Sequence, residues 1–214
     1  MRKILNYYAI TFMLTIMSTV TVFAQNSDNL SADERKARKE RLSSCGVFSE
    51  GLATYKDPKG LFGFIDKTGM LVVPCQWRRA WDFCEGLAHV ENTDQKSGFI
   101  DKTGEVVIPC IWSYAYSFSE GLVAVKDCET GKYGFVDKTG KVVIPCKWND
   151  VNNFSEGLVW VTNDKWKNGY INKKGEIVIP CQYVSTWNFY DGYAKVMDEN
   201  HRLFYIDKSG REVR

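Results

Sequence analysis

The sequence repeats itself about every 35 residues over most of its length, and this period limits the folds that it can adopt. A phenylalanine recurs once per period, and a glycine follows it three residues later each time. The phenylalanines are Phe48, Phe83, Phe118, Phe154 and Phe189. A fixed period of this length is typical of units that stack or close into a ring, because one such unit cannot bury its own hydrophobic face.

A tetrapeptide Asp-Lys-Thr-Gly, or a close variant of it, keeps the same period. It occurs at Asp66–Gly69, Asp101–Gly104, Asp137–Gly140, Asn172–Gly175 and Asp207–Gly210. Its first side chain can accept a hydrogen bond from the backbone two residues on, and its glycine can adopt a positive φ angle. The motif therefore predicts a tight turn, and its Asp is better explained by turn geometry than by catalysis.

Each unit is predicted to contain three short β-strands, of which the first follows the periodic glycine. One set of positions in this strand is apolar and is predicted to face inward: Ala53, Ala88, Val123, Val159 and Ala194. The set that follows it shares no property and is predicted to face outward: Thr54, His89, Ala124, Trp160 and Lys195. Alternation of this kind is typical of a strand with one buried face.

The third strand follows the turn and contains a Pro-Cys pair in four units. The four cysteines of these pairs are Cys75, Cys110, Cys146 and Cys181. Every second residue of the strand is apolar, which predicts that these thiols are buried on one face. Equivalent positions of side-by-side units would lie roughly 14 Å apart, whereas a disulfide needs Cα atoms within about 7 Å. We therefore expect no disulfide among the four, and one pair among Cys45, Cys84 and Cys128 stays possible.

The run Phe-Ser-Glu-Gly-Leu, the Asp-Lys-Thr-Gly turn and the Val-Ile-Pro-Cys strand together resemble the bacterial WG-repeat family, from Phe48 to the C-terminus. The sequence departs from that family at the Trp-Gly pair that gives it its name. The pairs read at this place are Phe62-Gly63, Ser97-Gly98, Tyr133-Gly134, Asn168-Gly169 and Phe204-Tyr205. The resemblance implies an array of β-rich units without implying an activity, so no catalytic residue is carried over.

These observations predict an all-β fold. About five three-stranded units of residues 46–214, the last incomplete, are expected to form an open, solenoid-like array. The alternative is a small closed β-propeller in which the N-terminal segment completes the last blade. We expect the open array.

Residues 1–24 have the order of a secretory signal peptide. Arg2 and Lys3 precede an apolar run, and Val22-Phe23-Ala24 ends it with small residues at the two positions that a signal peptidase recognises. An uncleaved membrane anchor is the alternative, but threonines and serines interrupt a run that is already short for a span. We therefore expect an exported protein, in the periplasm, in the cell envelope or secreted, with no stable membrane span after cleavage.

Residues 25–45 differ in composition from the repeats. Ser31 followed by Glu34 predicts the start of a helix, and the mixed charges that follow predict a solvated helix or a flexible spacer. Removal of residues 1–24 leaves equal numbers of basic and acidic residues. Because nucleic-acid binding needs a basic face, no nucleic-acid partner is expected.

The sequence offers no constellation for a metal site or for nucleophilic catalysis. Its two histidines, His89 and His201, lie in different units, and its cysteines lack the Cys-x-x-Cys spacing. An acidic residue precedes each corner glycine, at Glu50, Glu85, Glu120, Glu156 and Asp191. A calcium ladder is conceivable there, but a carboxylate that caps the corner is favoured. We expect no cofactor, no metal and no enzymatic activity.

A row of aromatic side chains is the best candidate for a ligand-binding site. Trp81, Tyr116 and Trp187 stand two residues before a periodic phenylalanine, where the fourth unit has Asn152, and Trp160 of the outward set is a further candidate. Such rings could stack on sugars or accept a peptide, or they could pack between units as aromatic residues usually do. Two functions follow: an exported scaffold for a protein or peptide partner, or a carbohydrate-binding module of the cell envelope.

Overall fold

The computed structural model describes residues 30–213, and the signal peptide predicted for residues 1–24 lies outside them. The chain divides into one unit that ends at Ser43 and a strand-rich unit that begins at Ser44. Helix α2 (Ala32–Ser44) begins after Ser31, whose Oγ accepts a hydrogen bond from the Glu34 amide at 3.1 Å. This is the N-cap geometry expected of Ser31. None of the helices in residues 30–213 is long and apolar enough to cross a membrane.

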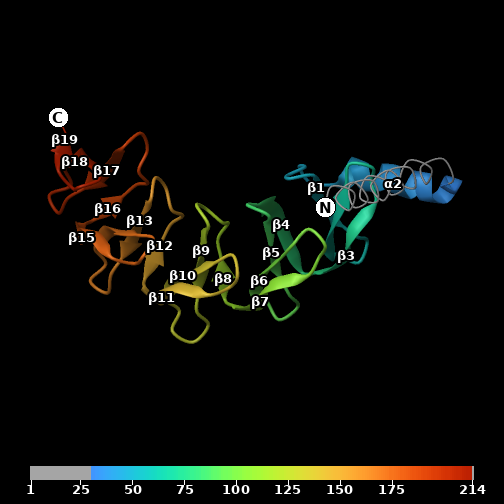
Figure 1. The fold of residues 1–214 in the computed structure, drawn as a ribbon, viewed down its shortest axis with the longest axis horizontal. Helices are drawn as coiled ribbons and strands as arrows, with labels where there is room; N and C mark the ends of the chain where they lie inside the picture. The colour runs from blue at the N-terminus through green and yellow to red at the C-terminus, as the bar shows by residue number, and fades with distance from the viewer. Residues whose placement is uncertain (1–29, 214) are drawn as a thin grey trace, which may run out of the picture. The chain divides into compact units, whose positions relative to one another are not determined.

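The strand-rich unit contains five antiparallel sheets that follow one another along the chain (Figure 1). The first sheet consists of β1 (Leu52–Lys56), β2 (Phe62–Asp66) and β3 (Leu71–Trp77). The second consists of β4 (Arg79–Cys84), β5 (Leu87–Glu91), β6 (Ser97–Ile100) and β7 (Val106–Trp112). The third consists of β8 (Tyr114–Ala115), β9 (Leu122–Lys126), β10 (Tyr133–Asp137) and β11 (Val142–Trp148). The fourth consists of β12 (Asp150–Val151), β13 (Leu158–Thr162), β14 (Asn168–Asn172) and β15 (Ile177–Tyr183). The fifth consists of β16 (Ser185–Thr186), β17 (Tyr193–Met197), β18 (Leu203–Asp207) and β19 (Glu212–Val213).

The all-β class and the three strands predicted for each unit are confirmed, and four of the sheets contain an additional strand. β4, β8, β12 and β16 each pair with the first long strand of their own sheet, as Ala115 of β8 does with Val125. Three of these additional strands are only two residues long. The sequence does not reveal them because so short a segment contains no alternation of polar and apolar residues.

The predicted turn forms between the second and third long strands. In the second sheet, Oδ1 of Asp101 accepts hydrogen bonds from the amides of Thr103 at 2.8 Å and Glu105 at 3.0 Å, and from the Thr103 hydroxyl at 2.6 Å. Gly104 has a φ of 90°, which lies in the region that favours glycine. The Asp therefore stabilises the turn, as its position predicts.

Both faces of the central strands are buried, which corrects the prediction that one set of the first strand points outward. Ala124 of β9 belongs to that set, yet it is as fully buried as Val123 and Val125 on either side of it. The sheets stack face to face, so a neighbour covers each face of an internal sheet. A single strand cannot show this in its sequence, because the residues that cover it belong to the next unit.

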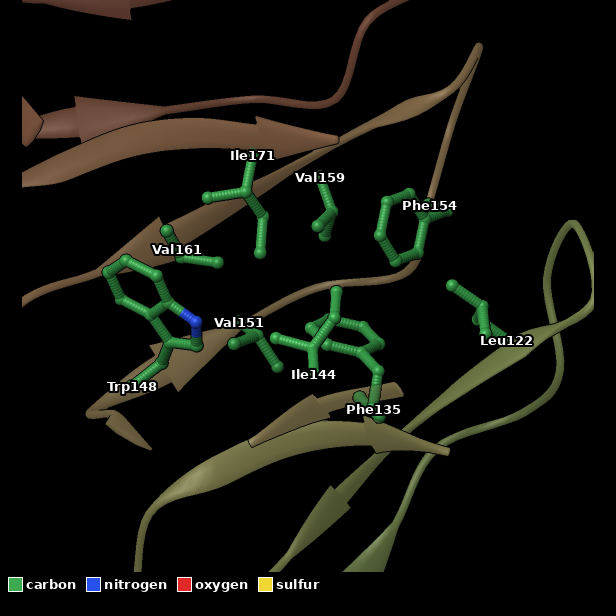
Figure 2. Packing of buried hydrophobic residues seen from close by; sticks show 10 residues of the cluster. Leu122, Phe135, Ile144, Trp148, Val151, Phe154, Val159, Val161 and Ile171 are labelled. Atoms are coloured by element: carbon green, nitrogen blue, oxygen red, sulfur yellow. The ribbon is translucent and has the colours of Figure 1, made fainter. Parts of the chain in front are cut away.

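Hydrophobic cores fill the four junctions between consecutive sheets of the described chain. At the junction of the third and fourth sheets, Phe135 and Ile144 pack against Val159 and Ile171 (Figure 2). The periodic Phe154 closes this core, and its ring meets that of Phe135 edge to face at 5.0 Å. The other junctions repeat this ring pair with Phe64–Phe83, Phe99–Phe118 and Tyr170–Phe189. The phenylalanine period is therefore the period of the junctions.

The open array is confirmed rather than the closed propeller. Each hydrophobic core joins a sheet to its successor along the chain. Within the strand-rich unit, the first and fifth sheets lie at opposite ends of the series (Figure 1). Each internal sheet therefore depends on two neighbours, and each end sheet on one.

A β-bulge interrupts the pairing of the third strand at the Pro-Cys pair. In the third sheet, Tyr133 pairs with Trp148 and Phe135 with Ile144, so β11 takes more residues than β10 to cover the same length. The bulge turns Cys146 partly out of the core, and all four repeat cysteines are half-buried rather than buried as predicted. No disulfide forms among the described cysteines, as expected for these four.

The bulge presses the backbone of the third strand against a glycine in the second strand. A Cβ atom on Gly134 would lie 2.5 Å from the carbonyl oxygen of Ile144 and 2.7 Å from the amide nitrogen of Cys146. Gly63, Gly98 and Gly169 meet their third strands equally closely. The glycine recurs because only its lack of a side chain permits this approach.

The fifth sheet has Phe204 at this position, which corrects the pair Phe204-Tyr205 read from the sequence. Leu203 pairs with Met197 and Phe204 with Val196, so Leu203-Phe204 is the equivalent pair. Within the described residues, β19 pairs only with Tyr205 and Ile206 of β18. No bulge presses on Phe204 there, and a large side chain is accommodated.

Candidate functional site

Polar contacts join the corner of each sheet to the next sheet. At the junction of the fourth and fifth sheets, a carboxylate oxygen of Glu156 accepts a hydrogen bond from the Gly192 amide at 3.0 Å. The same carboxylate forms an ion pair with the ammonium of Lys208 at 3.0 Å. We call this three-part contact of Glu, Gly amide and Lys a junction rung. The Ser155 hydroxyl beside it donates to the carbonyl oxygen of Phe189 at 2.7 Å.

The junction rung recurs at all four junctions of the described chain. Its ion pairs are Glu50–Lys102, Glu85–Lys138, Glu120–Lys173 and Glu156–Lys208, with distances of 3.0–3.1 Å. The neighbouring donors to the next unit's phenylalanine carbonyl are Ser49, Cys84, Ser119 and Ser155. The corner carboxylate therefore links two units and does not cap its own corner, which corrects the role favoured from the sequence.

The Glu of the junction rung occupies a backbone conformation that a glutamate rarely adopts. Glu120 has a φ of 54° and Gly121 a φ of 83°, and the amides and carbonyls of Ser119 and Leu122 bond to each other across them. This is a two-residue hairpin loop, in which Asn or Gly usually takes the first left-handed position. A glutamate occupies this position because its side chain is long enough to reach the next unit and form the junction rung.

The pKa values of these carboxyls reflect the junction rung. The hydrogen bond from Lys102 lowers the pKa of Glu50 below its ordinary value, despite some desolvation. For Glu120, desolvation by burial acts to raise the pKa, but Lys173 and the Gly157 amide outweigh it and the net shift is downward. Both carboxylates are therefore charged at neutral pH, and the contacts of the folded state stabilise this charged form.

The lysine of the turn motif is the functional partner that the sequence analysis missed. It follows the Asp in every Asp-Lys-Thr-Gly turn, and this recurrence is the signal that could have identified it. In four of the five turns it forms the ion pair of a junction rung.

Among residues 30–213, no group of three or more His, Cys, Asp and Glu side chains is placed to hold a metal ion.

Two of the aromatic candidates are partly exposed and have a polar partner. The indole of Trp81 stacks on the imidazole of His89, with ring centroids 4.0 Å apart and an angle of 6° between the planes. The ammonium of Lys195 lies over the ring of Trp187, 5.6 Å from its centroid. His89 and Lys195 hold the same strand position, so the two pairs are equivalent. A free ring face at such a pair can stack on a planar or sugar-like ligand.

The other two candidates are less accessible. The ring of Tyr116 contacts those of Tyr114 and Tyr133, and burial raises the pKa of Tyr116 to about 12. Trp160 packs against the core between the fourth and fifth sheets. It holds the strand position of His89 and Lys195 in its own unit. The four predicted rings thus belong to four different units, and the structure does not bring them together into one pocket.

His89 is the buried ionisable group of this region. It is 6% exposed, and its Nε2 has no hydrogen-bond partner. Desolvation by burial lowers the pKa of His89 to about 4. The imidazole is therefore neutral at physiological pH and serves as a ring beneath Trp81.

Contacts between loops form a second row at the junctions. Lys132 pairs with Asp164 of the next unit, and Lys167 pairs with Glu199 at 2.8 Å. At the corresponding place one junction earlier, the ammonium of Lys96 lies 3.1 Å from Sγ of Cys128.

A shallow cavity of about 600 Å³ lies beside the contact of Lys167 with Glu199, between the fourth and fifth sheets. Lys165, Lys167, Gln182, Asp198 and Asn200 are among the residues that line it. Charges of both signs and two amides suit a polar ligand better than an apolar one.

The sequence model of the WG containing repeat family matches residues 62–95, 98–127, 133–166 and 169–200. These segments make up more than half of the chain, and the first and third begin at the first residue of β2 and β10. No curated protein matches the sequence.

Several solved structures have a similar arrangement of strands. The computationally designed Ika8 protein is 13% identical, with a TM-score of 0.49 over 79% of this chain and 60% of that chain. BamB from Moraxella catarrhalis is 12% identical, with a TM-score of 0.44 over 78% of this chain and 58% of that chain. The WD40 beta propeller domain of Doa1 is 11% identical, with a TM-score of 0.38 over 80% of this chain and 66% of that chain. The chain thus spans about 60% of the length of the first two proteins.

Proposed function

This chain belongs to the WG containing repeat family, and from that premise we propose that it is an exported, non-catalytic scaffold that binds a protein or peptide partner in the cell envelope. The proposal has three parts: a repeat scaffold, a binding role and export. The family match and the five stacked sheets support the first part. The binding role and export need experiment.

The observation that carries the binding role is how the recurring polar residues are used. The Glu of the first four corners, the Ser or Cys before it and the Lys of the turn in the next unit bond across a junction. The Asp of each turn, as in Asp101, bonds to its own backbone. The residues common to all units thus build the array, and the side chains left for a partner are those in which the units differ.

Export rests on the sequence of residues 1–24, with its basic start, apolar run and small residues before Gln25. A scaffold beyond the inner membrane would meet envelope proteins and peptides first. The intact mass of the chain recovered from the exported fraction tests this part. Loss of residues 1–24 is expected, and a full-length chain held in the membrane would contradict it.

The binding role is tested by purifying the tagged, exported chain from its native envelope after chemical cross-linking. A partner present in stoichiometric amount is expected, and it should be retained when Asp101 is replaced by Asn, because that residue serves only its turn. Absence of any such partner, together with turnover of a small substrate by the purified chain, would contradict a non-catalytic scaffold.

A carbohydrate-binding module is the second candidate, and the exposure of Trp81 and Trp187 favours it. Each indole is braced by a second group, His89 or Lys195, and keeps one face for a sugar ring. Binding of the exported chain to a defined glycan array, lost in both Trp81→Ala and Trp187→Ala, would select this function. Trp166→Ala is the matched control, because Trp166 is the most exposed tryptophan and lies on a loop outside the row.

A further inference from the structure

Within residues 30–213, the fifth sheet leaves uncovered the face that every other sheet buries against its successor. On the fourth sheet, Leu158 and Tyr170 are 7% and 1% exposed. At the equivalent positions of the fifth sheet, Tyr193 and Tyr205 are 46% and 54% exposed. The two sheets thus carry the same kind of face, and only one of them has a partner among the described residues.

The corner of the fifth sheet also lacks the residues that join a corner to a following sheet. Tyr190 stands where Ser155 donates to the next unit, and Asp191 stands where Glu156 forms its junction rung. The ring of Tyr190 is 85% exposed. These substitutions replace a short linking group by a large exposed ring, and a long carboxylate by a short one.

We define the terminal face as Trp187, Tyr190, Asp191, Tyr193, Lys195, Leu203 and Tyr205, of which all but Asp191 and Lys195 are large exposed hydrophobic residues. A sheet face that meets water in a repeat array is usually polar, which keeps the array soluble. This one instead gains tyrosines at two positions, where the preceding unit has Ser155 and Leu158. Exposed Tyr and Trp gathered on one surface are typical of a protein interface.

Two opposite charges flank Tyr193 on the terminal face. Asp191 lies in the two-residue hairpin loop before it, with a φ of 52°, and Lys195 lies two residues after it on β17. Both side chains point away from the fourth sheet. Their equivalents show this, because Glu156 reaches the following sheet and Trp160 packs into the core that this sheet completes.

We propose that the terminal face binds the terminal face of a second copy of this chain, forming a two-fold symmetric dimer. A two-fold axis that bisects the line between Asp191 and Lys195 places Asp191 of each copy opposite Lys195 of the other, which makes the surface complementary to itself. The tyrosine and tryptophan rings then lose their contact with water, as the equivalent rings do at the internal junctions. A sugar would cover the rings but leave both charges without a partner, whereas a second copy pairs both of them.

Such a dimer goes beyond a scaffold with a single binding surface. It would join two arrays end to end and offer each binding position twice. A partner with two linked epitopes would then bind more tightly than one array allows, without any new contact.

The first test is the mass in solution of the chain recovered from the exported fraction, by light scattering and sedimentation. Twice the mass of one chain is expected at high concentration, falling toward the single mass on roughly 100-fold dilution, as mass action requires. A single-chain mass at every concentration overturns the proposal.

The decisive test exchanges the charges. Asp191→Lys leaves two lysines on the terminal face and Lys195→Asp leaves two aspartates, so each variant alone should be monomeric. A mixture of the two should dimerise again, because every contact then joins a lysine to an aspartate. Position 191 accepts a long side chain at its positive φ, as Glu156 shows at the equivalent place. Lys174→Asp, on an exposed turn outside the terminal face, is the matched control and should stay dimeric.

A third variant guards against failure to fold. Tyr193→Arg should give a monomer with the circular dichroism spectrum of the unchanged chain, since Tyr193 contributes to no core of the array. A dimer that survives both Asp191→Lys and Tyr193→Arg overturns the proposal. A monomeric chain whose sugar binding requires Tyr193 also overturns it, because the terminal face would then be a ligand site.

Discussion

Position by position, the fourth and fifth sheets present comparable faces, but a neighbour covers only that of the fourth. Tyr170 of the fourth sheet lies in a hydrophobic core with Phe189 and Ile206 of the fifth. Tyr205 holds the same place on the fifth sheet and is half-exposed. The difference shows that the burial of a side chain in this array is determined by the neighbouring sheet and not by the side chain's own unit. One side chain position can therefore be essential at one place and dispensable at another.

The largest expected effect comes from removing the ring at this strand position, which is Phe135 in the third sheet and Tyr205 in the fifth. Phe135→Ala should lower the free energy of unfolding by about 3–5 kcal/mol, because it empties part of a packed core. Tyr205→Ala should lower it by less than about 1 kcal/mol, because no sheet packs on that ring. Urea denaturation measures both, at a protein concentration where the chain is monomeric. Equal losses for the two variants would show that Tyr205 is buried in solution.

The glycine of the second strand gives the next effect. Gly134→Ala places a Cβ atom 2.5 Å from the Ile144 carbonyl oxygen, so the bulge must shift. We expect a loss of about 1–3 kcal/mol in the free energy of unfolding, as is typical of overpacking. The fifth sheet provides the contrast, since it already holds Phe204 at this position. Phe204→Ala should therefore not strain the backbone, and its loss should come from packing alone.

The sequence predicts most of what is local in this fold. The turn needs only the residues of one tetrapeptide, and Asp101 bonds within four residues of itself. The phenylalanine period predicts the spacing of the junctions, because Phe83, Phe118, Phe154 and Phe189 each close one of them.

What the sequence conceals lies between units. Glu50 pairs with Lys102, which belongs to the next unit, and periodicity alone does not show which of two recurring residues meet. The alternation in the first strand suggested one exposed face, but Ala124 is buried because the fourth sheet lies over it. The sequence likewise identifies the candidate rings as a row, but it does not show which of them are accessible. Trp160 packs into the core formed with the following sheet, whereas Trp187 is partly exposed.

A pH effect of intermediate size should separate His89 from Lys195, which hold the same strand position. Burial lowers the pKa of His89 to about 4, below its ordinary value of 6.5. As the pH falls through 6.5, the unfolded chain takes up this proton before the folded chain does, so stability is lost. The free energy of unfolding should fall by about 2 kcal/mol between pH 7 and pH 5.

The control for this pH effect is the same substitution at the two positions. His89→Gln should remove the pH dependence in that range, whereas Lys195→Gln should leave it unchanged. Urea denaturation at pH 7, 6 and 5 checks the difference between each variant and the unchanged chain. A slope that persists in His89→Gln would mean that another group is responsible.

The smallest effect concerns the junction rung and its counterpart at the terminal face. Glu120→Gln keeps the shape of the side chain but removes the charge that Lys173 holds at 3.0 Å. Because this pair is partly exposed and screened by salt, we expect a loss of only about 0.5–1 kcal/mol in the free energy of unfolding. Asp191→Asn should cost nothing measurable in the monomer, because no sheet of the described chain follows Asp191 and asparagine tolerates its positive φ.

The pKa of Glu120 is lowered in the folded state, so its contribution is present at neutral pH and disappears as the pH falls below about 4.5. Urea denaturation at low and high salt, at pH 7 and pH 3.5, measures both variants. A cost of Glu120→Gln that is unaffected by salt and by pH would show that the rung acts through packing and not through its charge.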